Sequence, residues 1–141
     1  MIYIQKNTVN NVVLTLSESV TLGLPFYIFK FQNEYNLVSN PILFSIEDIS
    51  PSTNRYNLFE IIENPSGSTS GGTISGTSIE LNLVEGQYDY EVYESSTNDL
   101  VITGKHLLES GRLVVDDVNN TDQSINEIIP GNNNNNENIY D

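Results

Sequence analysis

Apolar and polar residues alternate along most of the first 117 residues, which is the pattern of strands that bury one face. The clearest stretch is LVEGQYDYEV, where one alternating segment ends at Glu85-Gly86 and the next begins with Tyr88. A tight corner followed by a tyrosine is typical of immunoglobulin-like sandwiches, in which the tyrosine hydroxyl bonds back to upstream backbone groups. We therefore expect Gly86 and Tyr88 to form a structural corner.

The same alternation predicts seven to nine short antiparallel strands, with turn signals between them. The chain has no alanine, the best helix former, and many β-branched and aromatic residues. We predict an all-β, immunoglobulin-like β-sandwich over residues 1–117. The expected strands are Ile2–Gln5, Asn11–Ser17, Phe26–Gln32, Ile42–Ile49, Arg55–Glu63, one around Ile79, one from Tyr88, and a final pair of Leu100–Thr103 with Gly111–Asp117.

Period-2 spacing also predicts which side chains face the core. Two segments do not fit a strand: Asn64–Gly76 is a Ser/Gly/Thr stretch too poor in apolar groups to pack, and Lys105–Ser110 is a helical candidate too short to matter. The predicted inward side chains are Val12, Leu14, Leu16, Tyr27, Phe29, Phe31, Ile42, Phe44, Ile46, Ile79, Leu81, Leu83, Tyr88, Tyr90 and Val92.

Residues 118–141 differ in composition from the rest of the chain. They form an acidic, Asn-rich, low-complexity tail that includes five consecutive asparagines and cannot bury enough apolar area to order itself alone. Its tip places Ile139 beside Tyr140. Such a tip could add a strand to a neighbour's sheet edge and place one of these side chains in a pocket. The simpler interpretation is a tail with two incidental apolar residues.

Charge restricts the possible partners. Five basic residues against 19 acidic ones give a formal net charge of −14, and the basic residues are scattered along the chain. Nucleic acids and anionic membranes are therefore disfavoured as partners. A partner with a basic patch is favoured, although solubility alone would explain the acidity equally well. The first residues show no basic region followed by an apolar run, so we do not expect Sec export, and no stretch approaches the roughly 20 apolar residues of a membrane span.

Residues for catalysis are scarce. His106 is the only histidine, no Gly-x-Ser-x-Gly elbow or phosphate-binding glycine loop is present, and there is no cysteine. The acidic segment Asp116–Asp122 offers oxygen ligands but lacks the glycine and the distant glutamate of a calcium-binding loop, so an acidic turn is favoured. We predict no catalytic, cofactor-binding or metal-binding residues. A hydrolase that depends on His106 is the least favoured alternative.

Four tyrosines are candidates for exposure: Tyr3, Tyr35, Tyr56 and Tyr93. Exposed tyrosines serve protein interfaces or stack on sugars, although half-buried packing at the rim of a sheet is more common. A carbohydrate-binding module that uses Tyr35 and Tyr56 on host glycans is therefore one alternative function.

Several segments together resemble a known family: MIYIQKNTVNNVVLTLSES, PFYIFKFQN, GQYDYEVYESSTNDL followed by LESGRLVV, and NNNNENIYD. They are similar to small virion proteins of crAss-like tailed phages of gut Bacteroidetes, and the most specific part is Gly86 to Glu94 with Glu109 to Val115. The resemblance implies a non-enzymatic immunoglobulin-like structural subunit, made in the bacterial cytoplasm and located in the virion. It would be an auxiliary (decoration) protein, present in many copies on the major capsid protein or another virion protein, or alternatively an adaptor of a head, neck or tail fibre.

Overall fold

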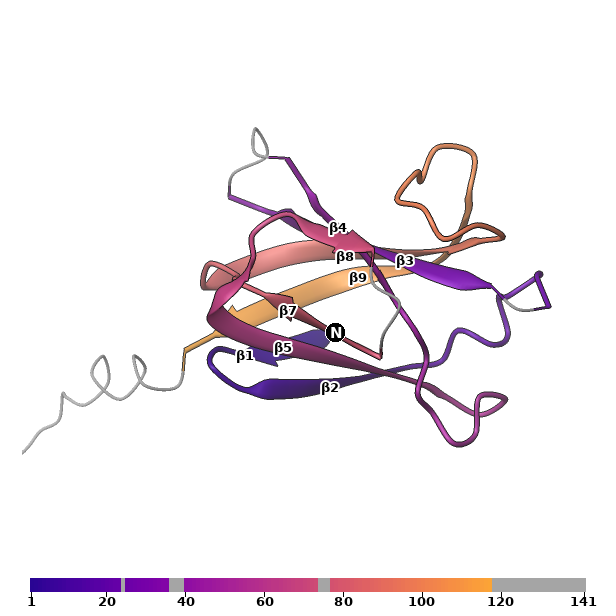
Figure 1. The fold of residues 1–141 in the computed structure, drawn as a ribbon, viewed down its shortest axis with the longest axis horizontal. Coiled ribbons are helices and arrows are strands. Elements are labelled where there is room, and N and C mark those ends of the chain that lie inside the picture. The colour runs from indigo at the N-terminus through magenta and orange to yellow at the C-terminus, as the bar shows by residue number, and fades with distance from the viewer. Residues whose placement is uncertain (24, 36–39, 74–76, 118–141) are drawn as a thin grey trace, which may run out of the picture.

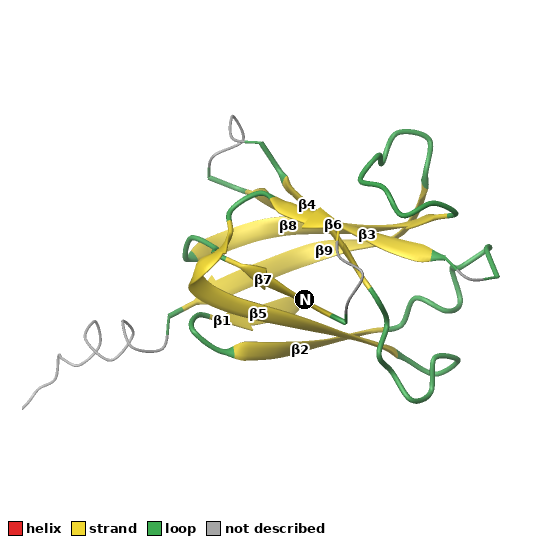
Figure 2. Cartoon of the chain, in the orientation of Figure 1, coloured by secondary structure: helices red, strands yellow, loops and turns green. Residues whose placement is uncertain are grey.

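The computed structural model describes residues 1–23, 25–35, 40–73 and 77–117 (Figure 1). Within these ranges every regular element is a strand and none is a helix (Figure 2). The strands are β1 (Ile2–Gln5), β2 (Val9–Leu14), β3 (Phe26–Asn33), β4 (Ile42–Ile46), β5 (Asn57–Ser68), β6 (Gly71–Thr73), β7 (Ser78–Leu81), β8 (Gly86–Ser95) and β9 (His106–Asp116).

The strands form two layers. One sheet has the order β1-β9-β8-β3-β4-β6, and the other has the order β2-β5-β7. Figure 1 shows the smaller sheet lying across the inner face of the larger one. The all-β class and the two packed layers predicted from the alternation are therefore confirmed.

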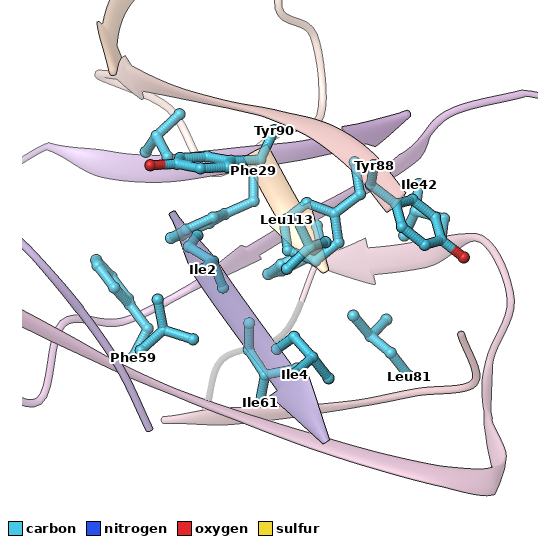
Figure 3. Packing of buried hydrophobic residues seen from close by; sticks show 14 of the residues in the cluster. Ile2, Ile4, Phe29, Ile42, Phe59, Ile61, Leu81, Tyr88, Tyr90 and Leu113 are labelled. Atoms are coloured by element: carbon cyan, nitrogen blue, oxygen red, sulfur yellow. The ribbon is translucent and has the colours of Figure 1, made fainter. Parts of the chain in front are cut away.

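The core lies between the sheets and is rich in aromatic rings (Figure 3). Phe59 of β5 meets two rings of β3 edge to face, with ring centroids 4.8 Å from Phe29 and 5.4 Å from Tyr27. Phe29 in turn stacks on Phe44 at 5.0 Å. All the predicted inward side chains are buried except Tyr27, which is partly buried and packs against the cluster.

Three strand pairs are parallel, so the prediction of antiparallel strands is wrong in part. β1 pairs with β9, β4 with β6, and β5 with β7 in parallel. Parallel neighbours need a crossover connection. Among the described strands the chain changes sheet six times, between β1 and β2, β2 and β3, β4 and β5, β5 and β6, β6 and β7, and β7 and β8. The first of these crossings turns at Asn7, whose φ is 62°.

The predicted Ser/Gly/Thr loop contains strand structure. β5 continues to Ser68, and β6 follows after a short turn. The Ser68 hydroxyl accepts from the Gly71 amide at 2.8 Å and donates to the Gly71 carbonyl at 3.0 Å. Leu43 then donates its amide to the Ser70 carbonyl. Backbone and hydroxyl hydrogen bonds therefore order a segment that has little apolar area to bury.

The predictions for the last strands are also wrong in part. Leu100–Thr103 lies in the connection between β8 and β9, where Lys105 Nζ bonds to Asp99 and to the Val101 carbonyl. The short helical candidate Lys105–Ser110 is mostly strand, because β9 begins at His106 and pairs with β8. Pairing with the long edge of β8 thus makes residues 106–110 a strand, although their local sequence pattern is ambiguous.

Gly71 is required where β6 approaches β4. Its φ is +92°, and a Cβ at this position would lie 2.0 Å from the Leu43 carbonyl oxygen. We expect Gly71→Ala to lower the free energy of unfolding by about 2 kcal/mol in urea denaturation, since backbone strain and a collision add. Gly104→Ala is the control, because Gly104 has φ +78° but open space around it. Equal losses in the two variants would contradict a close approach at β6.

Candidate functional site

Each end of the sandwich holds one buried glutamate that ties loops together. At the end where β5 meets the β7–β8 corner, Glu63 is 1% exposed. Its carboxylate accepts from the amides of Asn7 at 2.8 Å and Leu83 at 3.0 Å, and from Lys6 Nζ at 3.3 Å. Lys6 also donates to the Leu83 carbonyl at 2.6 Å. Burial raises the pKa of Glu63, but these donors more than offset it and leave the pKa below its ordinary value.

At the opposite end, Glu94 is 2% exposed and anchors the segment before β3. It accepts from the Thr21 hydroxyl at 2.6 Å and from the amides of Thr21 and Leu22 at 3.0 and 3.1 Å. His106 Nδ1 lies 2.5 Å from the Glu94 carboxylate, with the ring half exposed. Burial opposes ionisation, yet the bonds from Thr21, His106 and Leu22 lower the pKa of Glu94 to about 2. His106 therefore braces a structural carboxylate.

This arrangement predicts an acid-labile contribution to stability. The folded-state pKa of Glu94 lies below its ordinary value of 4.5, so its contribution is complete above about pH 4.5 and is lost as the pH falls towards 2. Glu94→Gln should lower the free energy of unfolding by about 2–3 kcal/mol at pH 7, and the difference from the unmodified protein should shrink between pH 4.5 and 2. Urea denaturation at several pH values measures this difference in the free energy of unfolding. A difference that does not change with pH would contradict this role.

The corner that follows β7 is built from Gly86 and Tyr88. The Tyr88 hydroxyl donates to the Val84 carbonyl at 2.8 Å, and Gly86 has φ +145° with open space around its Cα. The buried Tyr88 ring therefore joins the core to the backbone just before β8.

The outer face of the three-stranded sheet carries two exposed valines. Val9 and Val13 of β2 are 54% and 58% exposed. They pair across the sheet with Ile62 and Leu58 of β5, which are half-buried. Between these two aliphatic pairs lies the pair of Asn11 and Glu60. We call Val9, Val13, Leu58 and Ile62 the aliphatic face.

Most of the cations are paired within the chain. Four of the five Lys and Arg side chains form ion pairs with the chain's own carboxylates. These pairs are Lys6–Glu63 at 3.3 Å, Lys30–Glu91 at 3.6 Å, Lys105–Asp99 at 3.2 Å and Arg112–Glu34 at 2.7 Å. The charge available to a partner is therefore almost entirely negative.

The predicted sugar-stacking pair is not brought together. Tyr35 is 78% exposed just beyond the end of β3, whereas Tyr56 is half-buried just before the start of β5. Tyr56 lies at the end of the sandwich where β3 begins, because the neighbouring Asn57 bonds to Asp48, just after the strand that pairs with Tyr27. Tyr35 lies at the opposite end, where β3 finishes. The length of β3 alone separates them by roughly 25 Å. Tyr3 is exposed on β1, and Tyr93 is half-buried on β8.

The tail tip Ile139–Tyr140 and most of the acidic segment Asp116–Asp122 lie outside the described residues. Among the residues that are described, no group of three or more His, Cys, Asp or Glu side chains could hold a metal ion. Those same residues include no helix able to cross a membrane.

Sequence reasoning did not single out Glu63 and Glu94, although the alternation gives a signal for both. Each glutamate falls on the inward side of its strand, two residues after Ile61 and Val92 respectively. A carboxylate on a core-facing position needs several donors, and the structure supplies them.

Comparison of the chain with models of protein families, with curated proteins and with solved structures finds no match to any of them.

Proposed function

We propose that the chain is a non-enzymatic structural protein of a tailed-phage particle, an auxiliary (decoration) protein bound to the outside of the shell. The observation that carries the proposal is the aliphatic face, which is open to solvent on the outer side of β2 and β5. Exposed apolar patches with polar surroundings mark sites of interaction on proteins, and here the Asn11–Glu60 pair divides the patch into two aliphatic pairs. A partner that covers Val9 and Val13 would remove this surface from water.

The edge of β2 supports the same proposal. β2 is the first strand of its sheet and pairs only with β5 among the described strands. Its sequence VNNVVL has no charge and no proline, the two features with which proteins commonly protect an edge strand. Backbone groups on this edge are suited to strand addition by a partner.

Charge indicates the kind of partner. A protein with net charge −14, most of whose cations are already paired, favours a basic protein surface and is repelled by packaged nucleic acid. We therefore place it on the outer side of the shell, in many copies on the major capsid protein or another virion protein. An adaptor of a head, neck or tail fibre would use the same surface in few copies.

We also propose that the sandwich is a variant of the immunoglobulin-like arrangement. The neighbouring order β3-β8-β9 and the Tyr88 hydrogen bond to Val84 support it. The smaller sheet departs from that arrangement, because the strand before the corner, β7, lies at the edge and runs parallel to β5 instead of pairing with β2.

Quantitative mass spectrometry of purified particles tests the proposed function. We expect the chain at a copy number comparable to that of the major shell protein. A few copies per particle would favour the adaptor, and finding the chain only in the lysate of infected cells would overturn both.

A double variant tests whether incorporation into particles depends on the aliphatic face. Val9→Thr with Val13→Lys should leave folding almost unchanged, since both sites are exposed, but should reduce incorporation into particles at least tenfold. Tyr3→Thr is the control, because Tyr3 is 68% exposed on the other sheet. Equal incorporation of the two variants would contradict the role of this face.

A further inference from the structure

A hollow of 590 Å³ opens at the end of the larger sheet where β3 begins and β4 ends. Pro25, Phe26, Tyr27 and Ile46 form its apolar walls, and Gly23, Thr53 and Asn98 close it from three connecting segments. Its volume lies within the range of sites that bind small ligands or single side chains. Phe26 is 39% exposed, so part of its ring is open to solvent.

Two carboxylates border this hollow, and no Lys, Arg or His is among its lining residues. Asp48 accepts hydrogen bonds from the amides of Ser50 and Leu58 at 2.9 Å and from the Asn57 side chain at 2.7 Å. These neutral donors fix the orientation of Asp48 without compensating its charge. Glu47 is exposed and has no ion pair within the described ranges.

Nearby charges make the floor of the hollow more negative. The pKa of Tyr27 is raised, first by burial and then by the charges of Asp48 and Glu94. His106 faces Glu94 from β9, and Arg55 follows the lining residue Thr53 by two positions, but neither basic residue is among those that line the hollow. The hollow thus combines aromatic and aliphatic walls with uncompensated negative charge.

We propose that this hollow binds an ammonium or guanidinium group carried on an aliphatic stem, as in a lysine or arginine side chain of the partner. The stem would pack on Pro25 and Ile46, and the cation would meet Glu47 and Asp48 beside the Phe26 ring. A neutral sugar would leave both carboxylates uncompensated, and an anion would be repelled. The assignment of the ligand to a protein partner rests on the proposed function, whereas the affinity for the cation does not.

Amide NMR titration of the full chain tests the proposal, with N-acetyl-arginine methylamide and its lysine counterpart as probes. We expect saturable shifts at Phe26, Thr53 and Asn98, with a dissociation constant on the order of 1 mM for a single side chain. N-acetyl-citrulline methylamide, which has nearly the same shape but no charge, should bind at least tenfold more weakly. Equal binding of the citrulline probe, or no saturable shift with either cation, would overturn the proposal.

Matched variants test whether the arginine probe binds in the hollow. Glu47→Gln and Phe26→Leu should each weaken arginine binding several-fold, while Glu18→Gln removes an exposed charge outside the hollow and should not. Equal weakening by Glu18→Gln would mean that only the overall charge matters and would contradict a built site.

A last comparison distinguishes the source of the cation. Butylguanidine, whose guanidinium is its single charge, is compared with arginine inside a blocked five-residue peptide. Tighter binding of the peptide supports a protein partner, and equal or tighter binding of butylguanidine overturns that part of the proposal. If the cation probes fail while the chain is abundant in particles, the proposed function stands and only this site is withdrawn.

Discussion

Phe59→Ala is expected to lower the free energy of unfolding by about 3–5 kcal/mol, measured by urea denaturation. Phe59 has no exposed surface, and its ring, which belongs to the smaller sheet, contacts Phe29 and Tyr27 of the larger one. Truncation of this ring leaves a cavity between the two sheets. Because the strands of each sheet are hydrogen-bonded to one another, the sheets cannot move together far enough to close it. Phe59→Leu, which refills most of that volume, should cost about 1–2 kcal/mol.

Leu58→Ala provides the control, since Leu58 is the neighbouring residue on β5 but faces outward. It should cost less than about 1 kcal/mol. If Leu58→Ala proves as costly as Phe59→Ala, the assignment of the inner face of β5 is wrong.

Glu63→Ala is expected to cost about 3 kcal/mol or more, because it removes the acceptor of one buried amide, one partly buried amide and one ammonium group. The amides belong to Asn7 and Leu83, which lie on different sides of the sandwich end. Loss of the carboxylate should therefore loosen the β1–β2 turn and the β7–β8 corner together. Urea denaturation gives the energy, and amide hydrogen exchange at Asn7 and Leu83 gives the location.

Two further variants separate the carboxylate from general effects of charge. Glu60→Ala on the outward side of β5 should change stability by no more than about 0.5 kcal/mol. The double variant Lys6→Met with Glu63→Leu should recover part of the loss, since it removes the buried charge together with its partner. Unaltered exchange at Asn7 and Leu83 in Glu63→Ala would contradict the bracing role.

The residues of the core could be predicted from the sequence because a strand repeats every two residues. Ile2–Gln5 matches the first strand end to end, and the predicted inward residues Phe29, Phe44 and Val92 have no exposed surface. A side chain that points inward on a regular strand does so whichever strand is its neighbour. Alternation therefore carries this information locally.

Strand pairing could not be predicted in the same way. The parallel contacts of β1 with β9 and of β5 with β7 depend on where the chain crosses between sheets, and no local pattern encodes that choice. β6 was missed because Gly71 and its serine neighbours are ordered by hydrogen bonds, whereas periodicity reports only apolar burial. Leu100–Thr103 has strand-like composition, but it lies in the connection between β8 and β9, where Lys105 bonds to Asp99 and to the Val101 carbonyl.

The candidate sites follow from three-dimensional neighbours. The aliphatic face combines β2 with β5, whose facing residues Val9 and Ile62 are 53 positions apart in the sequence. The hollow gathers Pro25, Glu47 and Asn98 from three separate segments. Only the acidic excess and its preference for a basic partner could be predicted from composition.

The central claim is that a partner covers the aliphatic face in the assembled particle. Amide hydrogen exchange followed by mass spectrometry, on the free protein and on purified particles that contain it, tests this claim directly. We predict slower exchange in the particle for peptides that cover Val9–Leu14, the strand that contributes both exposed valines and the unpaired edge. Unchanged exchange in β2, with slowing confined to another surface, would contradict it.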